Sequence, residues 1–403
     1  MTRGGRHTRD AAVDARRSTL DARSRTHLYA TRALHSHQAL SRSHARPSTT
    51  TMAAARMTSL LPLRLTRVAV ARANAVKRAA TVCHAHRRQS RAMSTRAAAM
   101  ASSSAEDNVY RVMSANQEVS VVTVVGTSLV REAASRHRTA PTATAALGRN
   151  LMCALLLGTF KGEDETTQVM FKGDGPLGQC IAVATHDGQV KGLVSNPNAD
   201  PPLRPDGKLN VGAAIGKGVL TVSRAHPSMK QPFSGTVEIR TGEIAEDVAG
   251  YLQESEQVGS AIAVGVSINR DCEVIAAGGY MVQILPFASD ETIRVLERVI
   301  PSLPSSTALV QEGLTAQQIA QRVLDELEER VDLATSMTPS YGPCEEDELR
   351  QRMLRAVASL GKEEVNQILA EDGQIEITCE FCKTTSILTE QDLVAAQNEV
   401  ERT

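Results

Sequence analysis

The sequence contains few aromatic residues and no tryptophan: its 403 residues include only five tyrosines and five phenylalanines. It also lacks an uninterrupted apolar run of about 18 residues, the length that a membrane-spanning helix requires. After residue 105 the acidic residues outnumber the basic ones, whereas binding to nucleic acid depends on clustered Lys and Arg that contact phosphates. We therefore expect no membrane association and no nucleic-acid partner.

Negative charge is almost missing from the first 105 residues, although the chain as a whole has a formal charge of zero. This segment has 20 Lys and Arg but three acidic residues, none after Asp21, which gives +17; the remainder has 25 basic and 42 acidic residues, which gives −17. A segment rich in Arg, Ala and Ser is typical of an organelle transit peptide. We predict that residues 1–105 are a transit peptide or disordered basic segment directing the chain to the chloroplast, with the mitochondrion as the alternative. A basic arm that binds nucleic acid is the competing interpretation.

Histidine is scarce beyond the basic segment, where only His137, His186 and His226 occur. They are far apart in the sequence, and no nucleophile–base pair is evident. The C-terminal part cannot supply a histidine ligand, because no histidine follows His226. We expect no catalytic residues, and we expect that the protein is not an enzyme.

Residues 106–288 have the pattern of an α+β domain. A nearly all-apolar stretch at 141–160 predicts a buried helix, and residues 243–254 predict a second helix. Apolar residues that alternate with period two predict strands; these are 121–125, 167–172, 179–185, 190–194, 218–224, 235–239, 261–268 and 273–285. Hairpin connections between strands indicate an antiparallel sheet. Cys153, Cys180 and Cys272 lie in apolar contexts and are expected to be inert core residues.

Residues 289–340 predict a helical linker made of two amphipathic helices joined by 301–312. The second helix begins with a capping box formed by Thr315 and Gln318. Each helix has one apolar face; the predicted face residues are Ile293, Leu296, Val299 and Ile300 in the first, and Ile319, Val323, Leu324 and Leu327 in the second. An ordinary pair of helices packed on the domain explains this pattern as well as a special function does.

Residues 341–403 contain clustered cysteines: Cys344, and the sequence Cys379-Glu-Phe-Cys382. A Cys-x-x-Cys turn places two thiolates on one side of a knuckle, as a tetrahedral metal requires. The intervening pattern predicts helices at 347–361, with Asp347 as N-cap, and at 362–370, followed by a strand at 375–378. So small a domain has little core and commonly depends on a metal or a disulfide. A thiol oxidoreductase and a zinc-ribbon module that binds nucleic acid are alternatives; the motif lies outside a thioredoxin-like βαβ unit.

Several segments, taken in order, resemble the family of 33 kDa heat-shock chaperonins. They are Gly173-Asp-Gly-Pro-Leu-Gly, Gly216-Lys-Gly-Val-Leu-Thr-Val, Ala276-Ala-Gly-Gly-Tyr-Met-Val-Gln-Ile-Leu-Pro, Ile368-Leu-Ala-Glu-Asp-Gly and Ile377-Thr-Cys-Glu-Phe-Cys. The resemblance implies a redox-regulated, ATP-independent chaperone (a holdase) that binds unfolded or misfolded client proteins under oxidative and heat stress. It also implies a linker that unfolds on activation, a C-terminal redox-switch domain that binds zinc, and a homodimer as the active form.

The sequence departs from this family at the first cysteine pair. The family pattern is Cys-x-Cys followed by Cys-x-x-Cys, but Glu346 and Glu348 occupy the first pair of positions and Cys344 lies upstream. We predict that Cys344, Cys379, Cys382 and one carboxylate, from Glu346, Asp347 or Glu348, bind zinc. A weak or empty site and a simple dithiol–disulfide pair are the alternatives. The resemblance implies that Cys379 and Cys382 form the redox disulfide.

Overall fold

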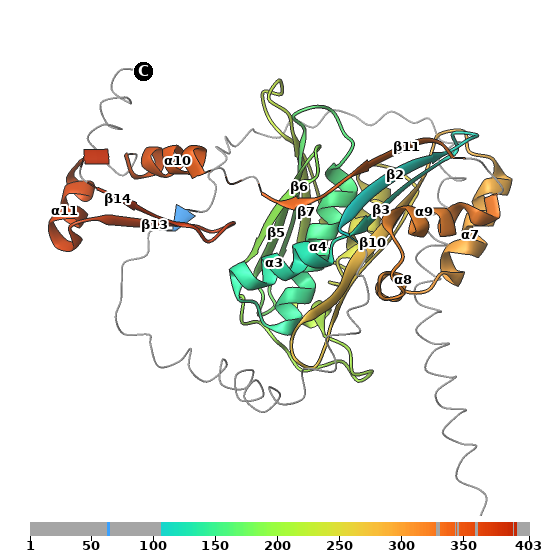
Figure 1. Ribbon diagram of the computed structural model, residues 1–403, viewed down its shortest axis with the longest axis horizontal. Helices are drawn as coiled ribbons and strands as arrows, with labels where there is room; N and C mark the ends of the chain where they lie inside the picture. Colours follow the sequence, from blue (N-terminus) through green and yellow to red (C-terminus); the bar gives the residue numbers. More distant parts are fainter. Residues whose placement is uncertain are drawn as a thin grey trace, which may run out of the picture.

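The computed structural model describes residues 63–64, 106–327, 331–342, 344, 346–358, 362–389 and 391–392 (Figure 1). The predicted α+β class is confirmed: two largely antiparallel sheets lie on either side of one helix, and helices cover the far face of one sheet. Apart from Leu63–Arg64, the predicted transit segment lies outside the described residues. Within the described part, each helix is either too short or too polar to cross a membrane.

The central helix is α4 (Pro141–Gly158), which matches the predicted buried helix. Proline at its first position leaves no helical hydrogen bond unmade, since that position has no partner for an amide hydrogen. Almost every side chain of α4 is buried, because the helix packs against both sheets at once. An amphipathic pattern is therefore absent, as expected of a helix with no solvent-exposed face.

The first sheet has six strands in the order β12-β6-β5-β4-β7-β8. Their bounds are β4 (Thr166–Gly173), β5 (Gln179–Thr185), β6 (Gln189–Val194), β7 (Gly218–Ala225), β8 (Phe233–Glu238) and β12 (Ser340–Tyr341). Neighbouring strands are antiparallel, except that β12 runs parallel to β6. Side chains alternate between the faces, so that Cys180 and Ala182 join the core around α4 while Ile181 belongs to a separate cluster on the outer face.

The second sheet has five strands in the order β11-β2-β3-β10-β9. Their bounds are β2 (Asn108–Ser114), β3 (Val119–Val125), β9 (Ser260–Ile268), β10 (Val274–Ile284) and β11 (Val331–Met337). Three linker helices cover its outer face and form a second apolar cluster with it, namely α7 (Asp290–Ser302), α8 (Ser306–Gln311) and α9 (Ala316–Leu324). The predicted capping box is present at the start of α9, with Thr315 and Gln318 bonded reciprocally.

The prediction of a purely helical linker needs correction in two places. The connection predicted at 301–312 contains helix α8, and the last part of the linker is strand β11, which pairs with β2. The linker therefore completes an edge of the second sheet. Its final residue, Ser340, forms β12 together with Tyr341, the first residue of the predicted C-terminal domain, and joins the first sheet.

Three further helices of the N-terminal part are α3 (Thr127–His137), α5 (Val211–Ile215) and α6 (Ala245–Glu254). Strand β2 and helix α3 were not among the predicted elements. The buried residues Leu129, Val130, Ala133 and His137 of α3 are spaced as on one face of a helix, so the sequence did contain this signal.

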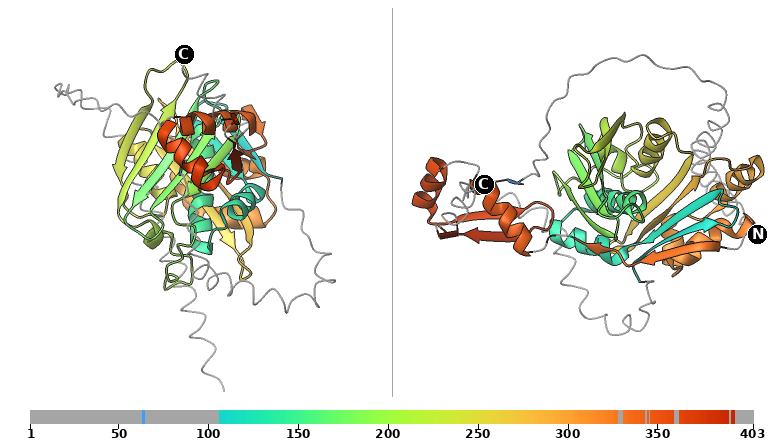
Figure 2. Two further views of the ribbon diagram at one scale, coloured as in Figure 1. Left: turned by 90° about the vertical axis from the view of Figure 1, so that its left-hand side faces the viewer. Right: turned by 90° about the horizontal axis from the view of Figure 1, so that it is seen from above.

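The C-terminal part projects from one end of the molecule (Figures 1 and 2). It contains α10 (Glu346–Ala358), α11 (Lys362–Asp372), β13 (Ile375–Cys379) and β14 (Thr385–Leu388), close to the predicted elements. Because α10 begins at Glu346, Asp347 lies inside the first turn and is not the N-cap. Strand β13 pairs with β14 on one side and with the short β1 (Leu63–Arg64) on the other. Met353, Val357, Val365 and Ile377 belong to a small apolar cluster that also includes Ile181 and Leu193 of the first sheet.

Candidate metal and redox site

The Cys-x-x-Cys motif forms a closed turn at the end of β13, here named the knuckle (residues 379–382). The amide of Cys379 donates to the carbonyl of Thr384 at 3.0 Å, and the amide of Lys383 donates to the carbonyl of Cys379 at 2.8 Å. Lys383 has a left-handed conformation with φ of 60°, which reverses the chain after the second cysteine. The reversal brings the thiols of Cys379 and Cys382 to the same side.

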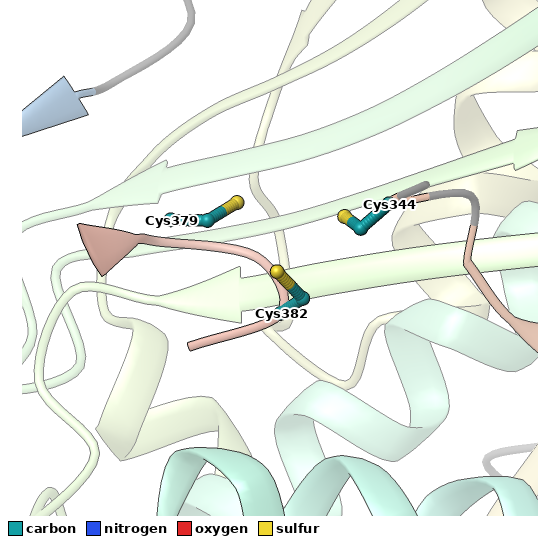
Figure 3. A group of neighbouring side chains, drawn as sticks. All are labelled: Cys344, Cys379 and Cys382. Atoms are coloured by element: carbon teal, nitrogen blue, oxygen red, sulfur yellow. The ribbon is translucent and has the colours of Figure 1, made fainter. Parts of the chain in front are cut away.

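The third thiol comes from the segment between β12 and α10. The sulfur atoms of Cys344, Cys379 and Cys382 point toward one another (Figure 3) and all lie within 4.8 Å of one another. Tetrahedral zinc with Zn–S bonds of about 2.3 Å separates its sulfur ligands by roughly 3.8 Å. A small closure of the cluster therefore suffices to hold zinc, and three soft thiolates suit that metal.

Hydrogen bonds among the three sulfurs divide their protons unequally. Cys382 accepts from Cys344 and Cys379, and these bonds lower the pKa of Cys382 far below that of an ordinary thiol, although burial opposes the shift. Cys344 has a raised pKa, because of its hydrogen bonds with Cys379 and Cys382 and because of burial. The cluster thus stabilises a thiolate at Cys382, where a metal cation can replace the shared protons.

Among the described side chains, the three cysteines are the group capable of binding a metal at this place. The backbone of Glu346 and Glu348 lies in the first turn of α10, two and four residues after Cys344. Their side chains and that of Asp347 lie outside the described residues. The fourth zinc ligand therefore stays a prediction.

The predicted redox disulfide between Cys379 and Cys382 also stays a prediction. The two thiols are close, but the Cys344 thiol also lies within 4.8 Å of each of them. A disulfide between Cys344 and the knuckle would link two segments of chain, whereas one within the knuckle would leave Cys344 as a thiol. The geometry permits all three pairings.

The remaining described cysteines lie elsewhere. Cys153 and Cys180 are buried as predicted, and burial raises the pKa of Cys153 strongly and that of Cys180 to about 12. The prediction of a core position for Cys272 was wrong. Cys272 is exposed, with φ of 62°, in the turn between β9 and β10, where Asn269 bonds the backbone of Glu273. Val274 and Ile275 account for the apolar context, but they follow the turn.

Three residues that the sequence did not assign to this site contact the knuckle from other elements. Arg136 and His137 end helix α3, and Tyr341 ends β12. The His137 Nε2 atom lies 2.9 Å from the carbonyl of Phe381, and Arg136 donates to the carbonyl of Cys382 at 3.3 Å. A histidine in register with the apolar face of a helix was the available signal, but it indicates burial and does not identify the contact.

The knuckle also packs on the outer face of the first sheet. Phe381 is 5% exposed and shares an apolar cluster with Ile181 of β5 and Leu193 of β6. The ammonium of Lys191 lies 5.6 Å from the centre of the Phe381 ring. The thiol cluster is therefore part of the contact between the C-terminal part and the first sheet.

Comparisons with known proteins agree on one family. The family model described as "Hsp33 protein" matches residues 107–388. A "33 kDa chaperonin" of Desulforamulus reducens is 38% identical over 297 residues, covering 73% of this chain and 99% of the relative. That of Bacillus subtilis is 36% identical over 298 residues, covering 73% and 100%. The crystal structure of the 33 kDa chaperonin from Thermotoga maritima matches with a TM-score of 0.67 and 31% identity, over 74% of this chain and all of that one.

Proposed function

The chain belongs to the Hsp33 family, whose relatives are named chaperonins, and from this premise we propose that it is an ATP-independent holdase gated by zinc and by Cys344, Cys379 and Cys382. It binds unfolding proteins and prevents their aggregation under oxidative and heat stress. The observation that carries the proposal is the convergence of three thiols inside the contact between the C-terminal part and the first sheet.

The thiols account for a reduced, closed state. Cys344, Cys379 and Cys382 would hold zinc as thiolates, and the metal would supply a link between the segment after β12 and the knuckle. The small core around Met353 and Val365 gains stability from this link, because a domain of this size buries little apolar surface. The closed state keeps Phe381 against Ile181 and Leu193, which leaves these side chains covered.

Oxidation of the thiols opens that state. One thiolate attacks hydrogen peroxide, the O–O bond breaks, and a sulfenic acid and hydroxide result. A second thiol displaces the sulfenic oxygen as water and forms the disulfide. The hydroxide takes up the proton that the first thiol lost on ionisation, so two thiols and one peroxide yield one disulfide and two waters. The disulfide cannot retain the metal, since its sulfurs carry no thiolate charge. The knuckle then loses its shape, and the apolar residues beneath it become available to unfolded clients.

The test uses the reduced protein comprising residues 106–403. Zinc content and free thiols are measured before and after peroxide, together with suppression of the aggregation of a thermally unfolding client. We expect one zinc per chain, release of that zinc as two thiols disappear, and suppression of aggregation only after oxidation. Full suppression by the reduced, zinc-loaded protein would refute redox gating. An absence of suppression in both states would refute the holdase function.

We also propose that residues 1–105 direct the chain to the chloroplast. The support is the charge of +17 in this segment and its position before the family match, which begins at residue 107. A fusion of residues 1–105 to a fluorescent protein should enter isolated chloroplasts and be shortened there. Import into mitochondria instead would contradict the assignment.

The active form is proposed to be a homodimer, as the family resemblance implies. Size-exclusion chromatography with light scattering, before and after peroxide, measures the mass directly. We expect a shift from monomer to dimer on oxidation.

A further inference from the structure

The carbonyl groups of the knuckle are held by side chains from outside the C-terminal helices and strands. The carbonyl of Phe381 lies 2.9 Å from His137 Nε2 and 2.8 Å from the Tyr341 hydroxyl. The carbonyl of Cys382 accepts from Arg136. We name Arg136, His137 and Tyr341 the knuckle clamp. Its members contact backbone carbonyls, so these contacts depend on the conformation of the turn and not on the identity of its side chains.

A count of hydrogens limits how the clamp can be bonded. Two carbonyls, those of Phe381 and Gly192, surround the Tyr341 hydroxyl, at 2.8 and 2.9 Å. Tyr341 has one hydrogen to share between these carbonyls, and His137 Nε2 lies 2.9 Å from both the Phe381 carbonyl and the Tyr341 hydroxyl. With a hydrogen on His137 Nε2, the Phe381 carbonyl accepts from His137 and the Tyr341 hydroxyl can donate to Gly192; without it, the hydroxyl is the donor to Phe381.

Neutral histidine is consistent with its surroundings. Burial, with the nearby charges of Lys383 and Arg136, lowers the pKa of His137 to about 4, while Glu380 and the carbonyl of Phe381 oppose the shift. Burial also raises the pKa of Tyr341, so its hydroxyl keeps its hydrogen. Both donors that the clamp needs are thus present at neutral pH.

The clamp is fixed to a rigid support. Arg136 and His137 belong to the last turn of α3, whose residues Leu129 and Val130 are buried in the main core. Arg136 pairs with Glu132 one turn earlier, and its guanidinium lies 5.0 Å from the centre of the Tyr341 ring. Tyr341 is held in place because β12 pairs with β6, where Tyr341 lies opposite Val190. Movement of the knuckle therefore breaks the clamp before it deforms the support.

We propose that the knuckle clamp couples the state of the thiols to the attachment of the C-terminal part. While the clamp is closed, the turn keeps the shape in which Cys379 and Cys382 face Cys344. A rearrangement of the turn moves the Phe381 and Cys382 carbonyls away from their donors and detaches the C-terminal part from α3 and β6. The proposal deepens the redox gating proposed above and rests on it.

This coupling is reciprocal: if the closed clamp favours the converged arrangement of the three thiols, the converged thiols favour the closed clamp by the same free energy. Opening the clamp must then weaken metal retention, and loss of one or two buried hydrogen bonds should do so about tenfold. Arg136, His137 and Tyr341 are positioning residues, since none of their side chains is among the group that can bind the metal.

The test compares Tyr341→Phe with Tyr280→Phe in the full chain, which keeps the pairing of β1 with β13. Tyr341→Phe removes the hydroxyl but keeps the ring that faces Arg136. Tyr280→Phe removes a buried hydroxyl from β10, in the cluster beneath the linker helices. The first readout is the rate at which reduced protein loses zinc to a chromogenic chelator. The second, which needs no metal, is hydrogen–deuterium exchange of residues 375–388.

We expect Tyr341→Phe to lose zinc about tenfold faster and to exchange faster across residues 375–388, while Tyr280→Phe behaves like the wild type. His137→Ala should act like Tyr341→Phe, and His137→Gln, which restores an N–H donor, should recover part of the loss. Circular dichroism melting checks that the N-terminal part remains folded in each variant.

Wild-type zinc loss and wild-type exchange in both Tyr341→Phe and His137→Ala would overturn the coupling. Equal acceleration in Tyr280→Phe would overturn it too, because the effect would then reflect general destabilisation. A failure of the holdase function gives a different pattern: oxidised wild type would not protect a client, although the clamp variants still differed in zinc loss. If the wild type binds no zinc, the exchange measurement alone decides.

Discussion

Two groups of cysteines in this chain have the same side chain and opposite chemistry. Cys153 and Cys180 lie in the core between α4 and the first sheet, where burial raises their pKa values and keeps them as thiols. Cys344, Cys379 and Cys382 are at the contact between two parts of the chain, where hydrogen bonds from neighbouring thiols lower the pKa of Cys382.

The comparison teaches that burial alone does not determine thiol reactivity. Cys379 and Cys382 are also largely buried, at 7% and 6% exposure. The difference lies in hydrogen bonds from neighbouring thiols. A thiolate that accepts two such bonds loses less solvation free energy on burial than a thiolate without them. Cys180 instead accepts from Asn150 at 3.5 Å and donates to the carbonyl of Ala146 at 3.9 Å. Four predictions test this contrast, in order of decreasing effect.

Removal of a knuckle thiol should have the largest effect. Cys382→Ser replaces a soft ligand with a hydroxyl, and zinc affinity should fall by more than about a hundredfold, because even changes around the ligands of metal sites cost ten- to a hundredfold. Competition with a fluorescent chelator measures this affinity. Cys272→Ser is the matched control, since it makes the same change at an exposed turn and should leave the affinity unaltered.

Acid should loosen the knuckle through His137. Its pKa is about 4 in the closed structure, from burial and the charges of Lys383 and Arg136 against that of Glu380, and near 6.5 when released. Between these two pKa values, His137 is protonated in the released state but not in the closed one. The closed state therefore loses stability as the pH falls from 6.5 toward 4.

Between pH 7 and pH 5, the free energy of unfolding should fall by about 2 kcal/mol through the protonation of His137. Urea denaturation of the wild type and of His137→Gln at both pH values measures it as the difference between the two proteins. Subtraction of the variant cancels protonation of the zinc ligands. Equal losses in the two proteins would contradict the role of His137.

A carboxylate ligand should make a smaller contribution than a thiolate. Of the variants Glu346→Gln and Glu348→Gln, we expect one to lower zinc affinity about tenfold, because an oxygen ligand is exchanged for water more readily than sulfur. Asp347→Asn serves as comparison within the same helical turn. Unchanged affinity in all three would indicate that zinc has three protein ligands and a water.

The core cysteines should contribute only to stability. Cys153→Ala should lower the free energy of unfolding by about 1 kcal/mol through lost packing, with no change in the peroxide response. In the native wild type, alkylation followed by mass spectrometry should label Cys272 rapidly, and Cys153 and Cys180 only in denaturant. Native labelling of Cys180 would contradict its position in the core.

Much of the fold followed from periodicity. The buried helix α4, the hairpin between β5 and β6 and the capping box at Thr315 rest on local patterns, and the structure agrees with each. Strand β11 could not be predicted in this way, because its pairing partner β2 is more than two hundred residues earlier in the chain. The position of Cys272 was missed for a related reason, since an apolar neighbourhood in sequence does not specify on which side of a turn the residue lies.

The sequence by itself determined the family, the α+β class and the three cysteines at which a metal can bind, because these depend on residue types, on their order and on local spacing. Only the tertiary structure decided that Cys344 meets the knuckle and that Arg136, His137 and Tyr341 hold its carbonyls. Those contacts join segments separated by as many as 246 residues. Their cause is the packing of α3 beside β12 and β6 at the edge of the first sheet, which no local pattern encodes.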